Sequence, residues 1–233
     1  MRISNITIMT AFAPILLLAG CENAPPAEQS GTEAGQSEAQ AVPVSGPELV
    51  ILAFGDSLFA GYNLAEDEGY PEQLQAAMRA RGINARVIDA AVSGDTTAAG
   101  AQRIAFLLDQ QLRKPDLALV ELGGNDMLRG LSPEQTRANL TTILDTLAAR
   151  DIPVLIMGMR APPNLGPDFQ AQFDGIYPDL AEKYDADLVP FFLEPVYDQQ
   201  DLMLADRIHP NPEGVEVLVG ETIDEVIDAL PDN

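Results

Sequence analysis

Short, continuous apolar runs alternate with longer amphipathic stretches from Glu48 to the end of the chain. Runs of this length and character are typical of strands buried on both faces, as in a parallel sheet that is covered by helices. They occupy residues 49–53, 85–91, 117–120, 154–157 and 188–192. Strands that alternate with helices predict right-handed crossovers. We therefore expect a three-layer α/β domain with a five-stranded parallel sheet over residues 48–233.

The helices between these strands are placed by apolar residues at helical spacing and by local stop signals. Residues 70–81 predict a helix that stops at Gly82. The next helix is expected to continue to Lys114, because Pro115 disfavours a helical residue before it. Its buried face is predicted to be formed by Ile104, Leu107, Leu108 and Leu112.

Later helices carry stronger start signals. Ser132-Pro133-Glu134-Gln135 has the composition of a capping box with proline at the first helical position. The apolar residues between Phe169 and Leu180 predict one helix, kinked at Pro178. Asn211-Pro212 begins a final helix.

The first 47 residues have a different character. One positive charge at Arg2 precedes an apolar segment over residues 8–19 that is too short to span a bilayer comfortably, which indicates a signal peptide over residues 1–20. Leu18-Ala19-Gly20-Cys21 resembles a bacterial lipobox, whose cysteine is acylated. We expect an exported, membrane-anchored lipoprotein facing the periplasm, with a soluble periplasmic protein as the alternative. Residues 21–47 then form a disordered acidic tether, because they lack the apolar area to offset ordering entropy.

Composition excludes several classes of function. With 36 acidic and 13 basic residues the formal net charge is −23, so nucleic acid is not expected as a partner. One cysteine and one histidine exclude an internal disulfide and Cys- or His-rich metal sites. Carboxylate sites for Ca²⁺ or Mg²⁺ remain possible in so acidic a chain, but no spaced Asp/Asn loop of the EF-hand kind is present.

Polar clusters follow the predicted strands at the edge where ligands bind in open α/β sheets. Asp56-Ser57 comes after the first strand, Gly94-Asp95 after the second and Asn125-Asp126 after the third. The only histidine, His209, follows Asp206 by three residues before the last helix. Alone, Ser57 could be part of a helix cap and His209 an ordinary loop residue. Together they supply a nucleophile, a base and a carboxylate that orients the base.

Acyl transfer also needs hydrogen-bond donors for the developing oxyanion. The backbone N–H groups of Ser57 and Gly94 and the side-chain amide of Asn125 are candidates for this role. Taken singly, Gly94 is an ordinary turn glycine and Asn125 an ordinary loop residue.

The four clusters, in this order, resemble the blocks of the SGNH (GDSL) hydrolases: Gly55-Asp56-Ser57-Leu58, Gly94, Gly123-Gly124-Asn125-Asp126 and Asp206-x-x-His209. The resemblance is closer to a branch of multifunctional bacterial esterases with thioesterase, lysophospholipase and arylesterase activities. It implies a flavodoxin-like fold, and it implies no metal and no cofactor. It also implies Ser57 as nucleophile, His209 as base, Asp206 as its orienting carboxylate, and Ser57, Gly94 and Asn125 as the oxyanion hole.

Small acyl esters, thioesters or lysophospholipids are the substrates that this resemblance implies. The substrate-binding residues are then expected around Asp56 and in the loops that carry Met127, Leu128, Arg160, Pro162 and Pro163. The same blocks leave two alternatives open: a carbohydrate O-acetylesterase, and a catalytically silent binding domain on the same scaffold.

Overall fold

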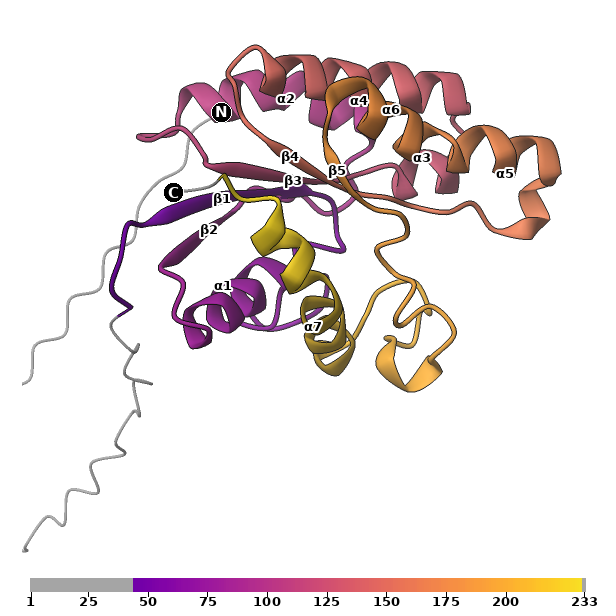
Figure 1. Ribbon diagram of the computed structural model, residues 1–233. Helices are drawn as coiled ribbons and strands as arrows, with labels where there is room; N and C mark the ends of the chain where they lie inside the picture. The colour runs from indigo at the N-terminus through magenta and orange to yellow at the C-terminus, as the bar shows by residue number, and fades with distance from the viewer. Residues whose placement is uncertain (1–43, 232–233) are drawn as a thin grey trace, which may run out of the picture. The chain divides into compact units, whose positions relative to one another are not determined.

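The sheet is parallel throughout and has the strand order β2-β1-β3-β4-β5 (Figure 1). The computed structural model describes residues 44–231. The expected signal peptide and Cys21, the expected acylation site, lie outside this range, as does all of the expected tether except its last four residues. The strands are β1 (Leu49–Gly55), β2 (Ala85–Asp89), β3 (Leu117–Glu121), β4 (Val154–Met157) and β5 (Asp187–Val189). The predicted five-stranded parallel sheet is confirmed.

Helices cover both faces of the sheet (Figure 1). On one face lie α1 (Tyr70–Ala80) and α7 (Pro212–Asp228), and on the other lie α2 (Thr97–Asp109), α4 (Pro133–Ala148) and α6 (Ile176–Tyr184). The short α3 (Gly124–Leu128) follows β3, and α5 (Pro167–Asp174) precedes α6. Two 3₁₀ turns, η1 (Pro163–Leu165) and η2 (Gln200–Leu202), lie in the later loops. Among the described residues no helix is both long and apolar enough to cross a bilayer.

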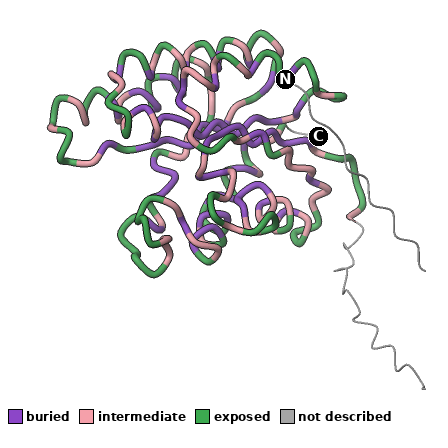
Figure 2. Tube along the Cα trace, turned by 180° about the vertical axis from the view of Figure 1, so that it is seen from behind, coloured by how far each residue is buried: buried purple, intermediate pink, exposed green. Residues whose placement is uncertain are grey.

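The core lies along the central strands (Figure 2). Residues 50–54 of β1 and 117–121 of β3 are buried, because helices pack on both sides of them. This burial explains why their sequences are continuous apolar runs rather than alternating ones. The order of the strands places a topological switch point between β1 and β3, where ligands bind in such sheets.

Two helix starts form as the sequence predicts. Ser132 accepts a hydrogen bond from Gln135 N, while the Gln135 side chain accepts one from Ser132 N, which completes the capping box. Asn211 caps α7 by accepting from Gly214 N at 2.9 Å. The second cap bears on function because it fixes the start of α7 at Pro212, three residues after His209.

Several predicted element boundaries were wrong, including the ends of the first two strands, which lie at Gly55 and Asp89. The second helix ends at Asp109, and Leu112 lies fully exposed instead of on its buried face. The break between the later helices falls at Gly175, whereas Pro178 lies in the first turn of α6, where its missing N–H costs no helical hydrogen bond. The fifth strand ends at Val189, because Pro190 cannot donate to the ladder.

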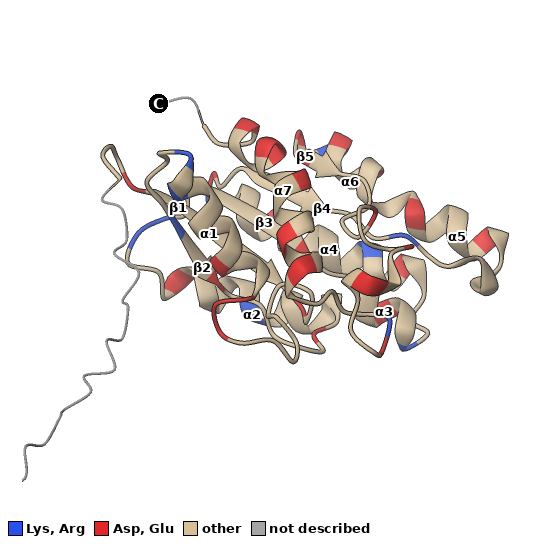
Figure 3. Ribbon diagram, turned by 90° about the horizontal axis from the view of Figure 1, so that it is seen from below, with Lys and Arg blue, Asp and Glu red and all other residues tan. Residues whose placement is uncertain are grey.

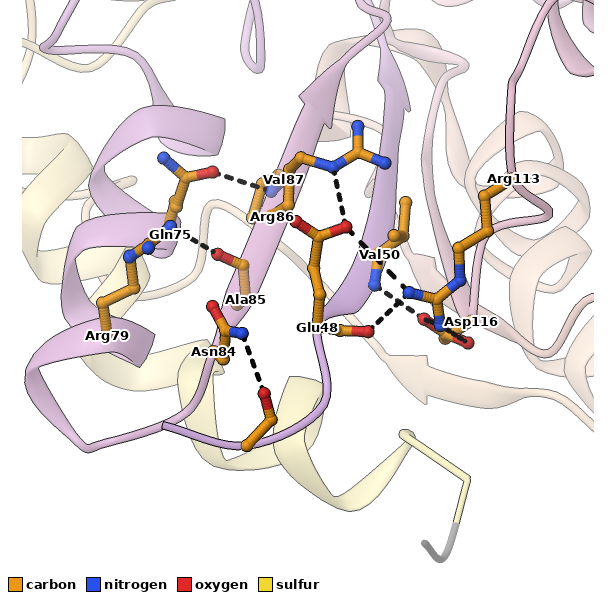
Figure 4. A network of polar contacts seen from close by, with 11 residues as sticks. Glu48, Val50, Gln75, Arg79, Asn84, Ala85, Arg86, Val87, Arg113 and Asp116 are labelled. Atoms are coloured by element: carbon orange, nitrogen blue, oxygen red, sulfur yellow. Dashed lines mark hydrogen bonds and ion pairs between the residues drawn. The ribbon is translucent and has the colours of Figure 1, made fainter. Parts of the chain in front are cut away.

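Polar contacts stabilise the amino ends of the strands, at the end of the sheet opposite to the polar clusters (Figure 4). Asp116 accepts two hydrogen bonds from Arg113 and a third, at 2.7 Å, from Val50 N. Arg113 also donates to the Glu48 carbonyl, and Arg86 pairs with the Glu48 carboxylate at 3.3 Å. These contacts set the start of β1 and β3, and thus the register that carries through to the functional edge.

Candidate active site

Ser57 follows β1 in a tight turn whose geometry depends on Gly55. A Cβ at Gly55 would come within 3.0 Å of the Glu121 backbone oxygen and 2.9 Å of the Phe59 ring. After it, Ala60 N donates to the Asp56 carbonyl and Tyr62 N to the Ser57 carbonyl. The turn therefore presents the Ser57 side chain at the carboxyl end of the central strand, as the sequence predicts.

His209 lies between Ser57 and Asp206. Its Nε2 is 2.8 Å from Ser57 Oγ, and its Nδ1 is 2.8 Å from Asp206 Oδ2. The three side chains thus form a continuous hydrogen-bonded series, although 152 residues separate the serine from the histidine. In this arrangement the imidazole can take the hydroxyl proton while the carboxylate fixes its tautomer.

Asp206 is held by its own loop. Its Oδ1 accepts hydrogen bonds from Ile208 N at 2.9 Å and His209 N at 3.1 Å. Slight burial favours the protonated carboxyl, but the hydrogen bonds from Ile208 and His209 outweigh it and lower the pKa of Asp206. The carboxylate is therefore ionised wherever a neutral histidine could act as base.

The candidate oxyanion donors lie next to Ser57. Gly94 and Asn125 line the same cavity as Ser57, each from a loop that follows a neighbouring strand. The N–H groups of Ser57 and Gly94 have no backbone acceptor within residues 44–231, so they are available to a ligand. Asn125 Nδ2 donates one hydrogen to Asp56 Oδ2 at 2.8 Å and has a second hydrogen to give.

Two buried carboxyl groups support this turn. Asp56 accepts from Leu58 N and Asn125 Nδ2, while Glu121 accepts only from Asp56 N, at 3.3 Å, and its Oε1 has no partner among the described residues. Burial, and then the neighbouring Asp56 charge, raise the pKa of Glu121 well above its ordinary value. Burial also raises the pKa of Asp56. Because Asp56 has more donors, we place the proton on Glu121 and the charge on Asp56.

Asp126, which adjoins Asn125 in the motif, points away from the site. It is fully buried and accepts hydrogen bonds from Thr97 N at 2.8 Å, from the Thr97 hydroxyl and from the Thr136 hydroxyl at 3.2 Å. These contacts tie α3 to the starts of α2 and α4. Asp126 thus holds Asn125 in place from behind.

Arg103 is a positioning residue that the sequence did not reveal. It donates to the carbonyls of Gly55 and Ala90 and pairs with Asp95 at 2.6 Å. Its guanidinium also lies 4.1 Å from the centre of the Phe54 ring. One side chain thereby joins the ends of β1 and β2, from which the Ser57 and Gly94 loops begin. Only a structure reveals this role, because helical spacing places Arg103 beside the predicted apolar face without indicating its contacts.

The site opens into a largely apolar cavity of about 700 Å³. The structure brings every predicted substrate-binding residue to its wall: Asp56, Met127, Leu128, Arg160, Pro162 and Pro163. Sequence reasoning missed further lining residues. Ile208 lies within the Asp206-x-x-His209 block, and the others come from segments without motifs: Tyr62, Met159, Phe191, Tyr197 and Met203. Within residues 44–231 no group of three or more His, Cys, Asp or Glu is placed to hold a metal ion.

Comparison with known proteins finds a matching family model, curated relatives and solved structures. The model of the GDSL-like Lipase/Acylhydrolase family matches residues 53–217. An arylesterase of Vibrio mimicus is 41% identical over 163 residues, which cover 70% of this chain and 80% of that protein. The thioesterase 1/protease 1/lysophospholipase L1 of Escherichia coli K12 is 41% identical over 161 residues, covering 69% and 75%. The crystal structure of AlinE4, an SGNH-hydrolase family esterase, is 63% identical and superposes with a TM-score of 0.68 over 81% of this chain and 100% of that one.

Proposed function

The chain belongs to the GDSL-like lipase/acylhydrolase family and hydrolyses ester bonds, and we propose that Ser57, His209 and Asp206 are its catalytic triad. The observation that carries this proposal is the position of His209, with one ring nitrogen 2.8 Å from the Ser57 hydroxyl and the other 2.8 Å from Asp206. A hydroxyl becomes a useful nucleophile when an oriented base stands within hydrogen-bond reach.

In the first half of the reaction Ser57 Oγ attacks the ester carbonyl carbon as His209 Nε2 takes its proton. The carbonyl electron pair moves to the oxygen, and the N–H groups of Ser57 and Gly94 and the Asn125 amide bind the resulting oxyanion. One such donor is typically worth about 3 kcal/mol in the transition state. Collapse of the intermediate expels the alcohol, which receives the proton from His209.

In the second half water hydrolyses the acyl-enzyme. His209 takes a proton from the water as its oxygen attacks the acyl carbon, and the same donors bind the second oxyanion. The proton then returns to Ser57 Oγ, which leaves as the free acid departs. Asp206 stays ionised and stabilises the imidazolium in both halves.

The substrates that we propose are aryl and short- to medium-chain acyl esters, thioesters and lysophospholipids. The apolar cavity supports an acyl chain, and relatives are named arylesterase and thioesterase 1/lysophospholipase L1. An apolar wall discriminates chain length weakly, by about 1–3 kcal/mol per methylene at most, so a broad range is expected. It gives an acetylated sugar little to bind, so the alternative of a carbohydrate O-acetylesterase is not favoured.

Labelling with a fluorophosphonate probe tests the nucleophile. We expect the wild-type chain to be labelled on Ser57 and Ser57→Ala to be unlabelled. Ser93→Ala is the matched control, because Ser93 lines the same cavity without touching the histidine, and it should still be labelled on Ser57. Labelling that persists in Ser57→Ala would contradict the assignment. A panel of acyl p-nitrophenyl esters, lysolipids and acetylated sugars then tests the substrate class.

We further propose that residues 1–20 are a lipoprotein signal peptide, 21–47 a tether and 48–233 the hydrolase domain. Acylation of Cys21 would anchor the enzyme to a membrane surface facing the periplasm. The lipobox-like sequence that ends at the only cysteine of the chain supports this proposal. In a bacterial host, wild type should incorporate radiolabelled palmitate and sediment with membranes, whereas Cys21→Ser should do neither. A labelled Cys21→Ser variant would refute the proposal.

A further inference from the structure

Large apolar side chains that remain exposed gather around the mouth of the active-site cavity. Four of them line it, and a fifth ends the turn η1, whose Pro163 also lines it. They are 39–63% exposed and come from different segments at the functional edge, including the end of α3 and the turn η1. We call these five residues the apolar rim: Tyr62, Leu128, Leu165, Tyr197 and Ile208.

The charges at the mouth differ from those of the chain as a whole. Asp56 is the only carboxylate in the cavity wall within the described residues, and it is buried. Two arginines, Arg160 and Arg207, share that wall. Arg160 pairs with Glu194 at 3.3 Å, and Arg129 donates to the carbonyl of Gly94 at 2.7 Å. A chain of net charge −23 thus carries cations beside the opening to its site.

Arg207 stands out among these cations. Every other lysine and arginine of residues 44–231 has a hydrogen-bond acceptor or an ion-pair partner, whereas the Arg207 guanidinium has neither. Its backbone has φ of 58°, a left-handed conformation that an arginine adopts only at a cost. The Arg207 guanidinium is therefore available to bind a partner outside the chain.

We propose that the apolar rim and Arg207 dock the enzyme onto a zwitterionic phospholipid surface, so that a lipid ester enters the cavity directly from that surface. Exposed leucine, isoleucine and tyrosine side chains are stabilised when they move from water into the interfacial region of a bilayer. A guanidinium binds phosphate oxygens well. Rim and arginine together therefore match the two layers of a phospholipid surface, the acyl boundary and the headgroup phosphate.

The net charge decides which kind of surface fits. An anionic leaflet repels an acidic protein, and acidic positions recur along α7 on the surface of the domain (Figure 3). A zwitterionic surface carries no net charge and still offers phosphates. Docking by the rim would leave the acidic helix facing water, whereas docking by α7 would bring its carboxylates against the headgroups.

This inference rests on the proposed function and extends it to the physical state of the substrate. A lysophospholipid or other long-chain ester resides in a lipid aggregate, and its acyl chain must leave that aggregate to reach Ser57. With the rim seated on the surface, the chain passes from lipid to apolar cavity without crossing water. Soluble short-chain esters do not need this step, so the two substrate types separate docking from chemistry.

A tryptophan reporter tests where the protein meets lipid, because the chain contains no tryptophan. The full chain with Cys21→Ser, which removes the proposed acylation site, is made with either Leu165→Trp or Leu112→Trp. Leu112 is the matched control: it is an exposed leucine beyond α2, at the end of the sheet away from the mouth. Each variant is titrated with vesicles of phosphatidylcholine, with and without bromine on the acyl chains.

We expect the emission of the tryptophan at position 165 to shift to the blue and to be quenched by brominated lipid, and that at position 112 to do neither. Equal responses at both positions, or none at position 165, would overturn the proposal. So would a blue shift at position 165 that grows with protein concentration without vesicles, since a second copy of the chain would then cover the rim.

Rates complete the test. In Leu165→Ser, hydrolysis of lysophosphatidylcholine micelles should fall about threefold to tenfold, while hydrolysis of dissolved p-nitrophenyl butyrate should stay within twofold of wild type. Arg207→Gly, which relieves the backbone strain, should lower the micelle rate more than the butyrate rate. An unchanged micelle rate in both variants would overturn docking and leave the esterase intact. Loss of the butyrate rate in the wild type itself would instead count against the proposed function.

Discussion

The side-chain amide of Asn125 donates a hydrogen bond to Oδ2 of Asp56 at 2.8 Å, so the residue before the proposed nucleophile orients a proposed oxyanion donor. Asp56 also accepts from Leu58 N at 3.1 Å, which ties it to the turn that carries Ser57. Nucleophile and donor are thereby held by one buried carboxylate. Preorganised donors of this kind lower the barrier without cost at the moment of reaction.

We predict that Asp56→Ala and Asn125→Ala each lower kcat about 100-fold or more and change KM little, because both remove the same oriented donor. The double variant should be hardly slower than either single one, since a donor can be lost only once. The measurement is kcat and KM for p-nitrophenyl butyrate in all four proteins. Fully additive losses would show that Asp56 and Asn125 act independently.

The orienting role proposed for Asp206 makes a separate prediction. In Asp206→Asn the side-chain amide can no longer hold the imidazole with its proton on Nδ1, and kcat should fall about 10³- to 10⁴-fold. Asp206 lies in an exposed loop, so the Tm should change little. The check is kcat beside a thermal melt of each protein. A variant with near-normal kcat would remove Asp206 from the triad.

Much of the fold was predictable because its signals are local. Continuous apolar runs at the central strands and the capping box at Ser132 each depend on a few adjacent residues, and the structure confirms them. The prediction for Leu112 was wrong because its spacing fits a helical face, whereas the chain must already turn there to begin β3. The path of the chain in the tertiary structure thus overrode the local helical pattern.

The site was predictable only as far as motifs mark it. Ser57 and His209 lie 152 residues apart, and their proximity could be expected because parallel strands bring their carboxyl ends to one edge. Arg103 and Glu121 could not be assigned in this way. The partly buried guanidinium of Arg103 and the buried carboxyl of Glu121 acquire their roles from partners far away in the chain, which no local pattern encodes.

Glu121 predicts a pH dependence of stability. Its pKa is raised in the folded state, so the folded protein keeps a proton that the unfolded chain loses above about pH 4.3. The free energy of unfolding should therefore decrease as pH rises from there towards the folded pKa, by up to about 1.4 kcal/mol per pH unit. Glu121→Gln cannot titrate and should lose this slope.

Urea unfolding at pH 5, 6, 7 and 8 measures the effect. The stability of Glu121→Gln relative to wild type should increase steadily with pH, whatever its constant offset. Glu134→Gln is the control, because the hydrogen bond with Ser132 lowers the pKa of Glu134. The stabilising effect of the Glu134 carboxylate is lost only as pH falls below the ordinary pKa of a glutamate. The difference in stability between Glu134→Gln and wild type should therefore stay constant from pH 5 to 8. Parallel curves for Glu121→Gln and wild type would mean that Glu121 is ionised in the folded protein.

The approach of Tyr177 to Gly123 gives the last prediction. Gly123 has φ of 124°, and a Cβ there would lie 2.2 Å from the Tyr177 hydroxyl but 3.5 Å from the ring carbon that bears it. Gly123→Ala should therefore cost at least about 2 kcal/mol, through backbone strain and this clash. Tyr177→Phe alone loses the hydrogen bond to the Leu122 carbonyl and should cost about 1 kcal/mol.

In the Tyr177→Phe background Gly123→Ala should cost less, because the hydroxyl oxygen with which the new Cβ clashes is gone while the backbone strain remains. A double-mutant cycle from urea unfolding measures this coupling, and strictly additive costs would show that strain alone excludes a side chain at position 123.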